Sequence, residues 1–302
     1  MSEQYLQQHI YMLSVWMDKS LANSLRDIIN LTNELIANRY GELSDEQTED
    51  IKTIKQSAIT MRAELRGDNT DPNPPQLEML RSRIHGLRTP LNSMIGFSQL
   101  FITHPDLYEG YRLSVGQLDV IRMIYNTSHH LLSLVTNAAD YSKLKGNQFH
   151  LGMEVDEFSL TKLLQNIESK WLLLSGLPYE MRMSADLPPV LGEKPRVQQT
   201  ILAMWEAVFY TAAGNKVLVE ATAKSTQDVF VSFTVDHLVP IQPIMTDALD
   251  LIWWADLQTI QPWQLGLHVA SAFAVAQGGA IGEYIDGSRR ILLLKLPTGI
   301  IR

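Results

Sequence analysis

Residues 83–92 read RIHGLRTPLN, and residues 93–100 continue the run as SMIGFSQL. His85 lies just over one helical turn before Pro90, inside a long stretch whose apolar residues have helical spacing. Thr89 follows His85 by four positions, so on a helix the two side chains lie on the same face. Proline removes a backbone donor and is expected to bend the helix just past the histidine. The stretch therefore predicts a helix that presents His85 and Thr89 together.

This stretch resembles the H-box of the sensor histidine kinases, which reads H-E-L-R-T-P-L-N, then an apolar stretch, then G-F-S. In that family the histidine accepts a phosphoryl group from ATP and passes it to an aspartate of a response regulator. The resemblance implies that His85 is the phosphoacceptor. It also implies that Thr89 helps to orient the water that dephosphorylates the response regulator. Imidazole suits the role, because its neutral form is a usable nucleophile at the pH of the cell.

One position departs from the family pattern. The acidic residue that follows the histidine in the family is here Gly86. In the family that acid would hold the imidazole and take its proton, which is the base role of proton-transfer catalysis. Without it, attack of His85 on ATP should be slow. The alternative interpretation is that His85 is only an exposed helix residue in an inherited scaffold.

Length and composition limit the function classes. A chain of 302 residues should hold about two domains. The net charge of −8 and the pI near 5.5 argue against nucleic acid or acidic membrane as the main partner. The absence of cysteine excludes disulfides and thiolate metal sites. We find no signal-peptide pattern and no uncharged apolar run near the roughly 18 residues of a membrane helix, so we expect a cytoplasmic protein without membrane insertion.

An internal repeat is visible in the first half of the chain. Residues 20–36 align without gaps on residues 85–101, with Ser20 at the place of the histidine. Ser44 and Gln47 then have the spacing of a capping box at the start of a second helix. This copy also looks like the dimerisation hairpin of the family, although a generic helical hairpin would show the same pattern.

The sequence divides into four segments. We predict a first helical hairpin without histidine over residues 1–66 and a linker over 67–75. A second hairpin with the H-box follows over 76–146, and an ATP-binding-like α/β domain over 147–302. One hypothesis is that hairpin one packs on hairpin two within one chain, as a pseudo-dimer with a single reactive histidine. The alternative is a homodimer in which both hairpins pair across chains.

The last segment resembles the ATP-binding domain of the histidine kinases. Residues 187–199 read LPPVLGEKPRVQQ, close to the family segment L-P-P-V-L-G-D-P-x-R-L-x-Q. We predict strands near 215–224 and 228–236 and a helix near 265–277. The fold class is therefore α+β, with antiparallel hairpins of the four-helix-bundle type followed by a histidine-kinase-like ATPase α/β sandwich.

The magnesium-binding motif of the family is altered. Its asparagine holds Mg²⁺ against the phosphates, and oxygen ligands are what this ion requires. Residues 203–211 read AMWEAVFYT, without asparagine at either possible register. Glu206 could in principle bind Mg²⁺, but Trp205, Phe209 and Tyr210 suggest apolar filling instead.

The two glycine-rich nucleotide motifs are also reduced. The family turn D-x-G-x-G appears as DHLVP over residues 236–240, so Asp236 remains and both glycines are lost. The family turn G-x-G-L-G-L appears as PWQLGL over 262–267, where only Gly266 remains. We interpret Asp236 and Gly266 as remnants of an ATP site. We expect no cofactor, with Mg-ATP bound only if the divergent pocket works.

Tryptophans gather in one further stretch and histidines in another. The stretch between the glycine motifs, where the family has a mobile lid, carries Trp253, Trp254 and Trp263, which we expect to pack on the domain or bind a partner. The adjacent His129 and His130 could suggest a metal, but they point in different directions on a helix and no third ligand is evident. We therefore predict no metal site.

These observations predict a pseudo-histidine kinase of two-component signalling. Its bundle would dock a response-regulator receiver domain beside His85, which could relay phosphate between receiver domains. A second interpretation, favoured by Ser20 and Gly86, is a scaffold that binds a partner and moves no phosphate. A third is an ATP-dependent kinase with divergent motifs, supported only by Asp236 and Gly266.

Overall fold

A computed structural model gives two compact units, Met1–Asn147 and Gln148–Arg302. The predicted linker at 67–75 and most of the lid stretch, with Trp253 and Trp254, lie outside the described residues. The structure describes residues 3–66, 77–104, 108, 112–145, 155–174, 178–223, 227–237 and 260–299.

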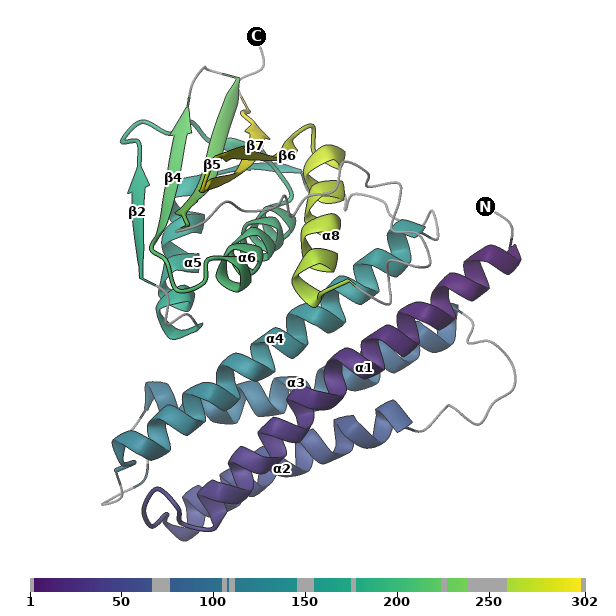
Figure 1. The fold of residues 1–302 in the computed structure, drawn as a ribbon, viewed down its shortest axis with the longest axis vertical. Coiled ribbons are helices and arrows are strands. Elements are labelled where there is room, and N and C mark those ends of the chain that lie inside the picture. The colour runs from purple at the N-terminus through teal and green to yellow at the C-terminus, as the bar shows by residue number, and fades with distance from the viewer. Residues whose placement is uncertain are drawn as a thin grey trace. The chain divides into compact units, whose positions relative to one another are not determined.

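The first unit consists of two helical hairpins (Figure 1). Hairpin one is α1 (Glu3–Ile36) and α2 (Asp45–Arg66), and hairpin two is α3 (Leu77–Thr103) and α4 (Val115–Lys145). Helix α1 packs on α2 and α4, and α3 packs on the same two helices. The hairpins of one chain thus form a four-helix bundle in which α1 and α3 lie on one diagonal.

The buried positions of the two hairpins repeat each other. Each buried position of α2 is matched by a buried position 70 residues later in α4, and the pairs are Gln47 and Gln117, Ile51 and Ile121, Ile54 and Ile124, Ala58 and Ser128, Met61 and Leu131, and Leu65 and Val135. Buried positions of α1 and α3 match at a spacing of 66, and the pairs are Ser14 and Leu80, Leu21 and Leu87, Leu25 and Leu91, Ile28 and Met94, Thr32 and Ser98, and Leu35 and Phe101. A helix turns one stripe toward its neighbours, so equal stripes mean that the two hairpins have one design.

This spacing corrects the alignment of the repeat by one residue. A spacing of 65 would place Ser20 opposite His85, but it would also pair buried Leu21 with exposed Gly86. At a spacing of 66, exposed Lys19 stands opposite exposed His85. The prediction for Ser20 is therefore wrong by one position, because the burial pattern, and not residue identity, sets the register of the repeat.

Both hairpins begin their second helix with the same cap. In hairpin one, Ser44 N donates to Gln47 Oε1 (3.0 Å) and Gln47 N donates to Ser44 Oγ (3.1 Å). In hairpin two, Ser114 N donates to Gln117 Oε1 (2.7 Å) and Gln117 N donates to Ser114 Oγ (3.1 Å). Each box satisfies backbone donors that a helix start leaves unpaired.

The second unit is built on a five-stranded mixed sheet in the order β2-β4-β5-β7-β6, in which only β2 and β4 are parallel. The strands are β2 (Tyr179–Met183), β4 (Val217–Ala223), β5 (Asp228–Asp236), β6 (Ala280–Asp286) and β7 (Arg289–Pro297). A separate two-stranded sheet pairs β1 (Asp156–Phe158) with β3 (Val190–Gly192).

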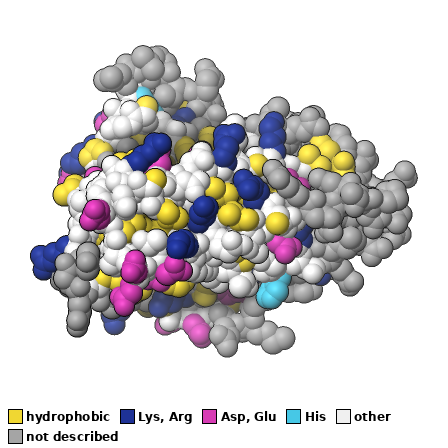
Figure 2. Space-filling model, turned by 90° about the horizontal axis from the view of Figure 1, so that it is seen from below, with side chains coloured by type: hydrophobic (Ala, Val, Ile, Leu, Met, Phe, Trp, Pro, Cys, Tyr) yellow, Lys and Arg dark blue, Asp and Glu magenta, His cyan; other side chains and the backbone are white. Residues whose placement is uncertain are grey.

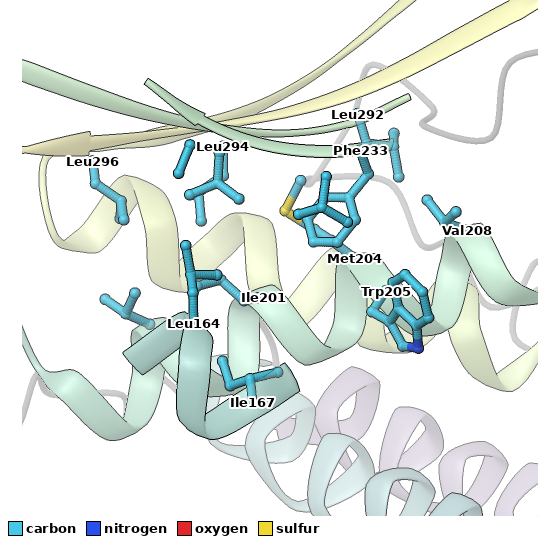
Figure 3. Close-up of a cluster of buried hydrophobic side chains, with 14 of the residues drawn as sticks. Leu164, Ile167, Ile201, Met204, Trp205, Val208, Phe233, Leu292, Leu294 and Leu296 are labelled. Atoms are coloured by element: carbon cyan, nitrogen blue, oxygen red, sulfur yellow. The ribbon is translucent and has the colours of Figure 1, made fainter. Parts of the chain in front are cut away.

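Three helices pack on one face of the larger sheet: α5 (Leu160–Leu174), α6 (Lys194–Thr211) and α8 (Pro262–Ala276). Alternate strand residues point toward them, as the period of two in a strand requires. Figure 3 shows Leu292, Leu294 and Leu296 of β7 facing Ile201 and Met204 of α6 across this layer. The core lies between sheet and helices, so the predicted fold class of helical hairpins followed by an α/β sandwich is confirmed.

Among the described residues, every helix falls short of the length and apolarity that crossing a bilayer would demand.

Candidate functional site

His85 and Thr89 both lie exposed on α3, on the side that faces away from the bundle core. Their neighbours Ile84 and Leu87 are buried and hold the helix against the bundle. The helical period therefore fixes which way the histidine points, because the apolar positions cannot leave the core. A side chain on a packed helix with its ring in solvent is accessible to a protein partner.

Helix α3 continues through Pro90, which is buried. A proline in a helix leaves the carbonyl four residues earlier without its usual donor, and here that carbonyl belongs to Gly86. A Cβ on Gly86 would lie 4.0 Å from a carboxylate oxygen of Glu64, an exposed residue of α2. The acid missing from position 86 thus has a neighbouring carboxylate that comes from hairpin one.

Arg83, two residues before His85, joins α3 to both helices of hairpin one. Its guanidinium donates to Ser14 Oγ (2.7 Å) and Asp18 Oδ1 (2.5 Å) on α1 and to the carbonyl oxygen of Leu65 on α2 (2.8 Å). The Arg83 side chain is only 9% exposed. Burial raises the pKa of Asp18 more than the hydrogen bond and charge of Arg83 lower it. This partly desolvated ion pair joins the two hairpins, and removal of one partner would leave the other charge without its counterion.

The histidine pair of α4 does not form a metal site. His129 packs edge-on against Tyr125, with ring centroids 4.5 Å apart. Across the part of the chain that the structure describes, no three His, Cys, Asp or Glu side chains gather as metal ligands would.

The positions of the magnesium-binding motif lie on α6. Ala203 and Ala207 are buried there and have no side-chain oxygen, whereas Glu206, the carboxylate considered for Mg²⁺, lies half-buried on the same helix. Trp205 is a core residue whose ring lies 5.7 Å from that of Tyr179 and 6.3 Å from that of Phe233 (Figure 3). The apolar filling predicted for Trp205 is therefore observed.

Two aromatic residues of α6 behave otherwise. Phe209 and Tyr210 are 37% and 48% exposed and form an edge-on pair with centroids 5.3 Å apart. The prediction that they fill the site is wrong, because both side chains lie in the last turn of α6 and remain partly exposed.

Asp236 ends strand β5 with an exposed carboxylate. Arg289 Nε donates to Asp236 Oδ1 at 2.7 Å, and this hydrogen bond raises the pKa of Arg289. The residue that would read an adenine amino group is thus engaged by an arginine of the neighbouring strand.

Gly266 lies inside α8 and is buried. The helix begins at Pro262, before the predicted start near 265, so Gly266 belongs to a helical turn and not to a loop. Gln261 and Gln264 form a capping box that ties up the first donors of this helix, and Pro262 has no N–H to offer. Few backbone donors are left there for a phosphate.

A buried ion pair lies on the helix-facing side of the sheet next to Asp236. Arg290 Nε donates to Glu283 Oε1 at 3.0 Å, and both side chains are nearly inaccessible, at 4% and 5% exposed. Burial first and Arg290 second lower the pKa of His237, the residue after Asp236. Charged side chains of the protein occupy this region.

Figure 2 shows one face of the molecule in space-filling form. Lys and Arg side chains gather across its middle, with acidic and hydrophobic side chains interspersed among them. Mixed charge of this kind is typical of a solvated protein surface.

Comparison with known proteins identifies the family. Residues 76–147 match the family model of the His Kinase A (phospho-acceptor) domain. The histidine kinase BarA of Escherichia coli K12 is 31% identical over 158 residues, which cover 50% of this chain and 16% of BarA. Residues 76–147 thus belong to the phospho-acceptor domain family of the histidine kinases, and half of the chain is similar to a histidine kinase.

Other relatives cover more of the chain. The sensory/regulatory protein RpfC of Xanthomonas campestris is 26% identical over 76% of this chain and 32% of its own length. Among solved structures, full-length ShkA in complex with AMPPNP has a TM-score of 0.49 at 21% identity, covering 75% of this chain and 47% of that chain. Acinetobacter baumannii AdeS has a TM-score of 0.43 at 18% identity, covering 72% of this chain and 98% of that chain. The chain thus spans a minor part of the curated relatives BarA and RpfC.

The structure brings His85 and Thr89 together on one helix and leaves Asp236 and Gly266 on separate elements of the second unit. Sequence reasoning missed the contacts of Arg83, whose partner Asp18 lies 65 positions away. No local pattern signals such a pair. The cap of hairpin two, in contrast, could have been found from its S-x-x-Q spacing, residues 114–117.

Proposed function

We propose that this histidine kinase relative acts in two-component signalling as a pseudokinase. Its bundle docks the receiver domain of a response regulator, and His85 exchanges a phosphoryl group with that domain without drawing it from ATP. The observation that carries the proposal is a contrast. His85 and Thr89 are exposed on one helix, while Asp236 is paired with Arg289 and Gly266 lies buried inside α8.

The chemistry needs only the imidazole and a charged receiver. A receiver aspartyl phosphate is a mixed anhydride, and an imidazole nitrogen of His85 attacks its phosphorus. The N–P bond forms as the P–O bond to the aspartate breaks, which returns the carboxylate, and the imidazole proton passes to solvent. Both phosphorylated forms are reactive, so the exchange can run in either direction. In this proposal Thr89, one turn away, holds a water against the receiver phosphate.

Phosphorylation of His85 by ATP would require more from the protein than exchange with a receiver domain. Phosphoryl transfer from a nucleotide depends almost wholly on positioning and on neutralising charge with metal and donors. Ala203 and Ala207 supply no metal ligand, so that Glu206 is the only carboxylate of α6, and Asp236 is paired with Arg289. At the start of α8, the capping box uses backbone N–H groups that could otherwise bind phosphate. These features support a protein that receives phosphate from a partner.

Phosphotransfer from charged receiver domains tests the proposal. A panel of receiver domains is labelled with radioactive acetyl phosphate and mixed with the wild-type protein, His85→Ala and His104→Ala. His104 is a matched control, since it is an exposed histidine just past the end of the same helix. Label is expected on the wild type and on His104→Ala and not on His85→Ala.

Phosphoramidate, which phosphorylates histidine directly, gives a readout that needs no partner. Its P–N bond breaks and ammonia leaves as the imidazole takes the phosphoryl group. If neither donor labels the wild type at position 85, the relay is refuted.

The second candidate is a scaffold that moves no phosphate. Gly86 favours it, because the usual acid beside the histidine is absent, and so does exposed Lys19 at the equivalent place in hairpin one. A scaffold would bind a receiver domain equally well in the wild type and in His85→Ala, with label on neither.

Mg-ATP titration by calorimetry separates both from an ATP-dependent kinase. No heat of binding is expected at millimolar nucleotide. Saturable binding that depends on Mg²⁺ would support the kinase alternative and remove the term pseudokinase.

A further inference from the structure

The helices of one chain cover each other's apolar stripes. The buried stripe of α3 and α4 packs on the matching stripe of α1 and α2, at the face where a second copy of hairpin two would otherwise pack. In a symmetric dimer such a face contacts its own copy. Here it contacts a related but different hairpin.

We propose that hairpin one is a built-in replacement for the second protomer. The chain closes its own four-helix bundle as a monomer, and each bundle has one histidine face, with Lys19 at the equivalent place on the other side. This assembly does not depend on whether His85 carries phosphate.

The first support is the set of partners of Arg83. It binds Ser14 and Asp18 on α1. In hairpin two the equivalent positions are Leu80 and Ile84, which are apolar. A second copy of hairpin two would therefore bury the guanidinium of Arg83 against two side chains that cannot accept a hydrogen bond, which is costly.

The second support comes from the loop of hairpin two. Tyr108 in this loop stacks on Phe101, with centroids 5.2 Å apart, and donates its hydroxyl to Asp50 of α2. Burial, and then Asp50, raise the pKa of the Tyr108 phenol. The equivalent of Asp50 in hairpin two is Val120, which offers no acceptor. This contact also exists only with hairpin one.

The third support is the reciprocal contact at the same end of the bundle. Ser114 Oγ donates to the carbonyl of Tyr40 (2.7 Å), and Gln117 Nε2 donates to the carbonyls of Gly41 (2.8 Å) and Glu42 (3.1 Å). The turn of hairpin one is therefore held on the cap of α4.

Chain connectivity favours the pairing within one chain. The contact of Arg83 with the Leu65 carbonyl puts the end of α2 beside α3, six residues from its start at Leu77. That separation is roughly 9 Å along a helix, whereas the residues between Arg66 and Leu77 can span roughly 33 Å when extended. Such a tether keeps the local concentration of hairpin one far above that of a second chain.

A cysteine pair tests the proposal in the full chain. Ser57 of α2 and Ser93 of α3 have their Oγ atoms 3.1 Å apart, which suits a disulfide, and the protein contains no other cysteine. Ser57→Cys/Ser93→Cys is oxidised, denatured and run without reductant. We expect a product of one-chain mass whose halves stay joined after a protease cut between residues 66 and 77.

A two-chain product would overturn the proposal, because it would mean that the hairpins pair across chains. Absence of any bond in a protein with wild-type helicity would overturn it too. The matched control is Ser57→Cys/Ser82→Cys, in which exposed Ser82 lies about 16 Å further along α3 and should not react.

Light scattering on the unmodified protein gives an independent reading. The mass of one chain is expected up to high micromolar concentration. A stable two-chain mass that Arg83→Met abolishes would overturn the proposal.

Discussion

The helical unit and the α/β unit treat their inherited functional positions in opposite ways. In the helical unit, the side chains of His85 and Thr89 are exposed to solvent. Arg83, in contrast, uses its hydrogen bonds to join the two hairpins. In the α/β unit, Asp236 pairs with Arg289 and a buried ion pair lies beside it. A site that binds a ligand must keep polar groups available for it. By that criterion, the pseudokinase that we propose has kept a site in its first unit and closed one in its second.

The largest effect is expected from the buried ion pair of the α/β unit. Glu283→Leu leaves the Arg290 guanidinium buried without its carboxylate, which should destabilise this unit by about 3–5 kcal/mol. Adding Arg290→Met should recover most of the loss, because an apolar pair of similar volume suits the site. Hydrogen exchange of the β6 and β7 peptides in denaturant measures the change.

The control for this prediction is Glu180→Leu, which breaks an exposed pair with Lys216 on the same sheet and should have little effect. If Glu283→Leu is as stable as this control, the pair does not close the site and the contrast between the units fails.

The second largest effect is expected at the contacts of Arg83 with hairpin one, two residues before His85. Arg83→Met removes the donors to Ser14 and Asp18, and we expect a loss of about 3 kcal/mol in the stability of the helical unit. Exchange of the α1 and α2 peptides should rise together, while the α/β unit stays unchanged. Arg88→Met, an exposed arginine on the same helix, is the control. Unchanged protection in α1 would show that the hairpins are held by their apolar stripes alone.

Much of the fold could be predicted from local pattern, because apolar spacing and caps are local signals. The second hairpin, predicted from residue 76, begins with α3 at Leu77, and the strand predicted near 228–236 is observed at Asp228–Asp236. The start of α8 was missed by three residues, since Gln261 and Gln264 cap it with side chains that are not usual caps.

The candidate site divides in the same way. The exposure of His85 follows from the helical period, which the sequence displays. The pairing of Asp18 with Arg83 and of Glu283 with Arg290 does not, because it depends on which elements meet in three dimensions. The register of the repeat was also misjudged by one residue, for burial decides it and letters alone do not.

The caps give a smaller and matched test of the duplication. Ser44→Ala and Ser114→Ala each remove a hydroxyl that accepts from the N–H of a glutamine, and each should cost about 1 kcal/mol. Ser114→Ala should cost more, because its hydroxyl also donates to the Tyr40 carbonyl of hairpin one. Urea denaturation of the two variants checks the order. Equal losses would mean that the contact between the hairpin ends adds nothing to stability.

The smallest effect is a pH dependence confined to the α/β unit. Burial, and then Arg290, lower the pKa of His237 below its ordinary value of 6.5, although Asp236 opposes the shift. The folded state therefore favours the neutral imidazole, and the unfolded state takes up a proton more readily. Stability from this residue is complete above pH 6.5 and is lost as the pH falls through 6.5 toward the lower folded value. Thermal unfolding between pH 7.5 and 5.5 should show a decline that His237→Asn reduces. If both proteins lose the same stability between pH 7.5 and 5.5, the loss comes from other titratable groups and not from His237.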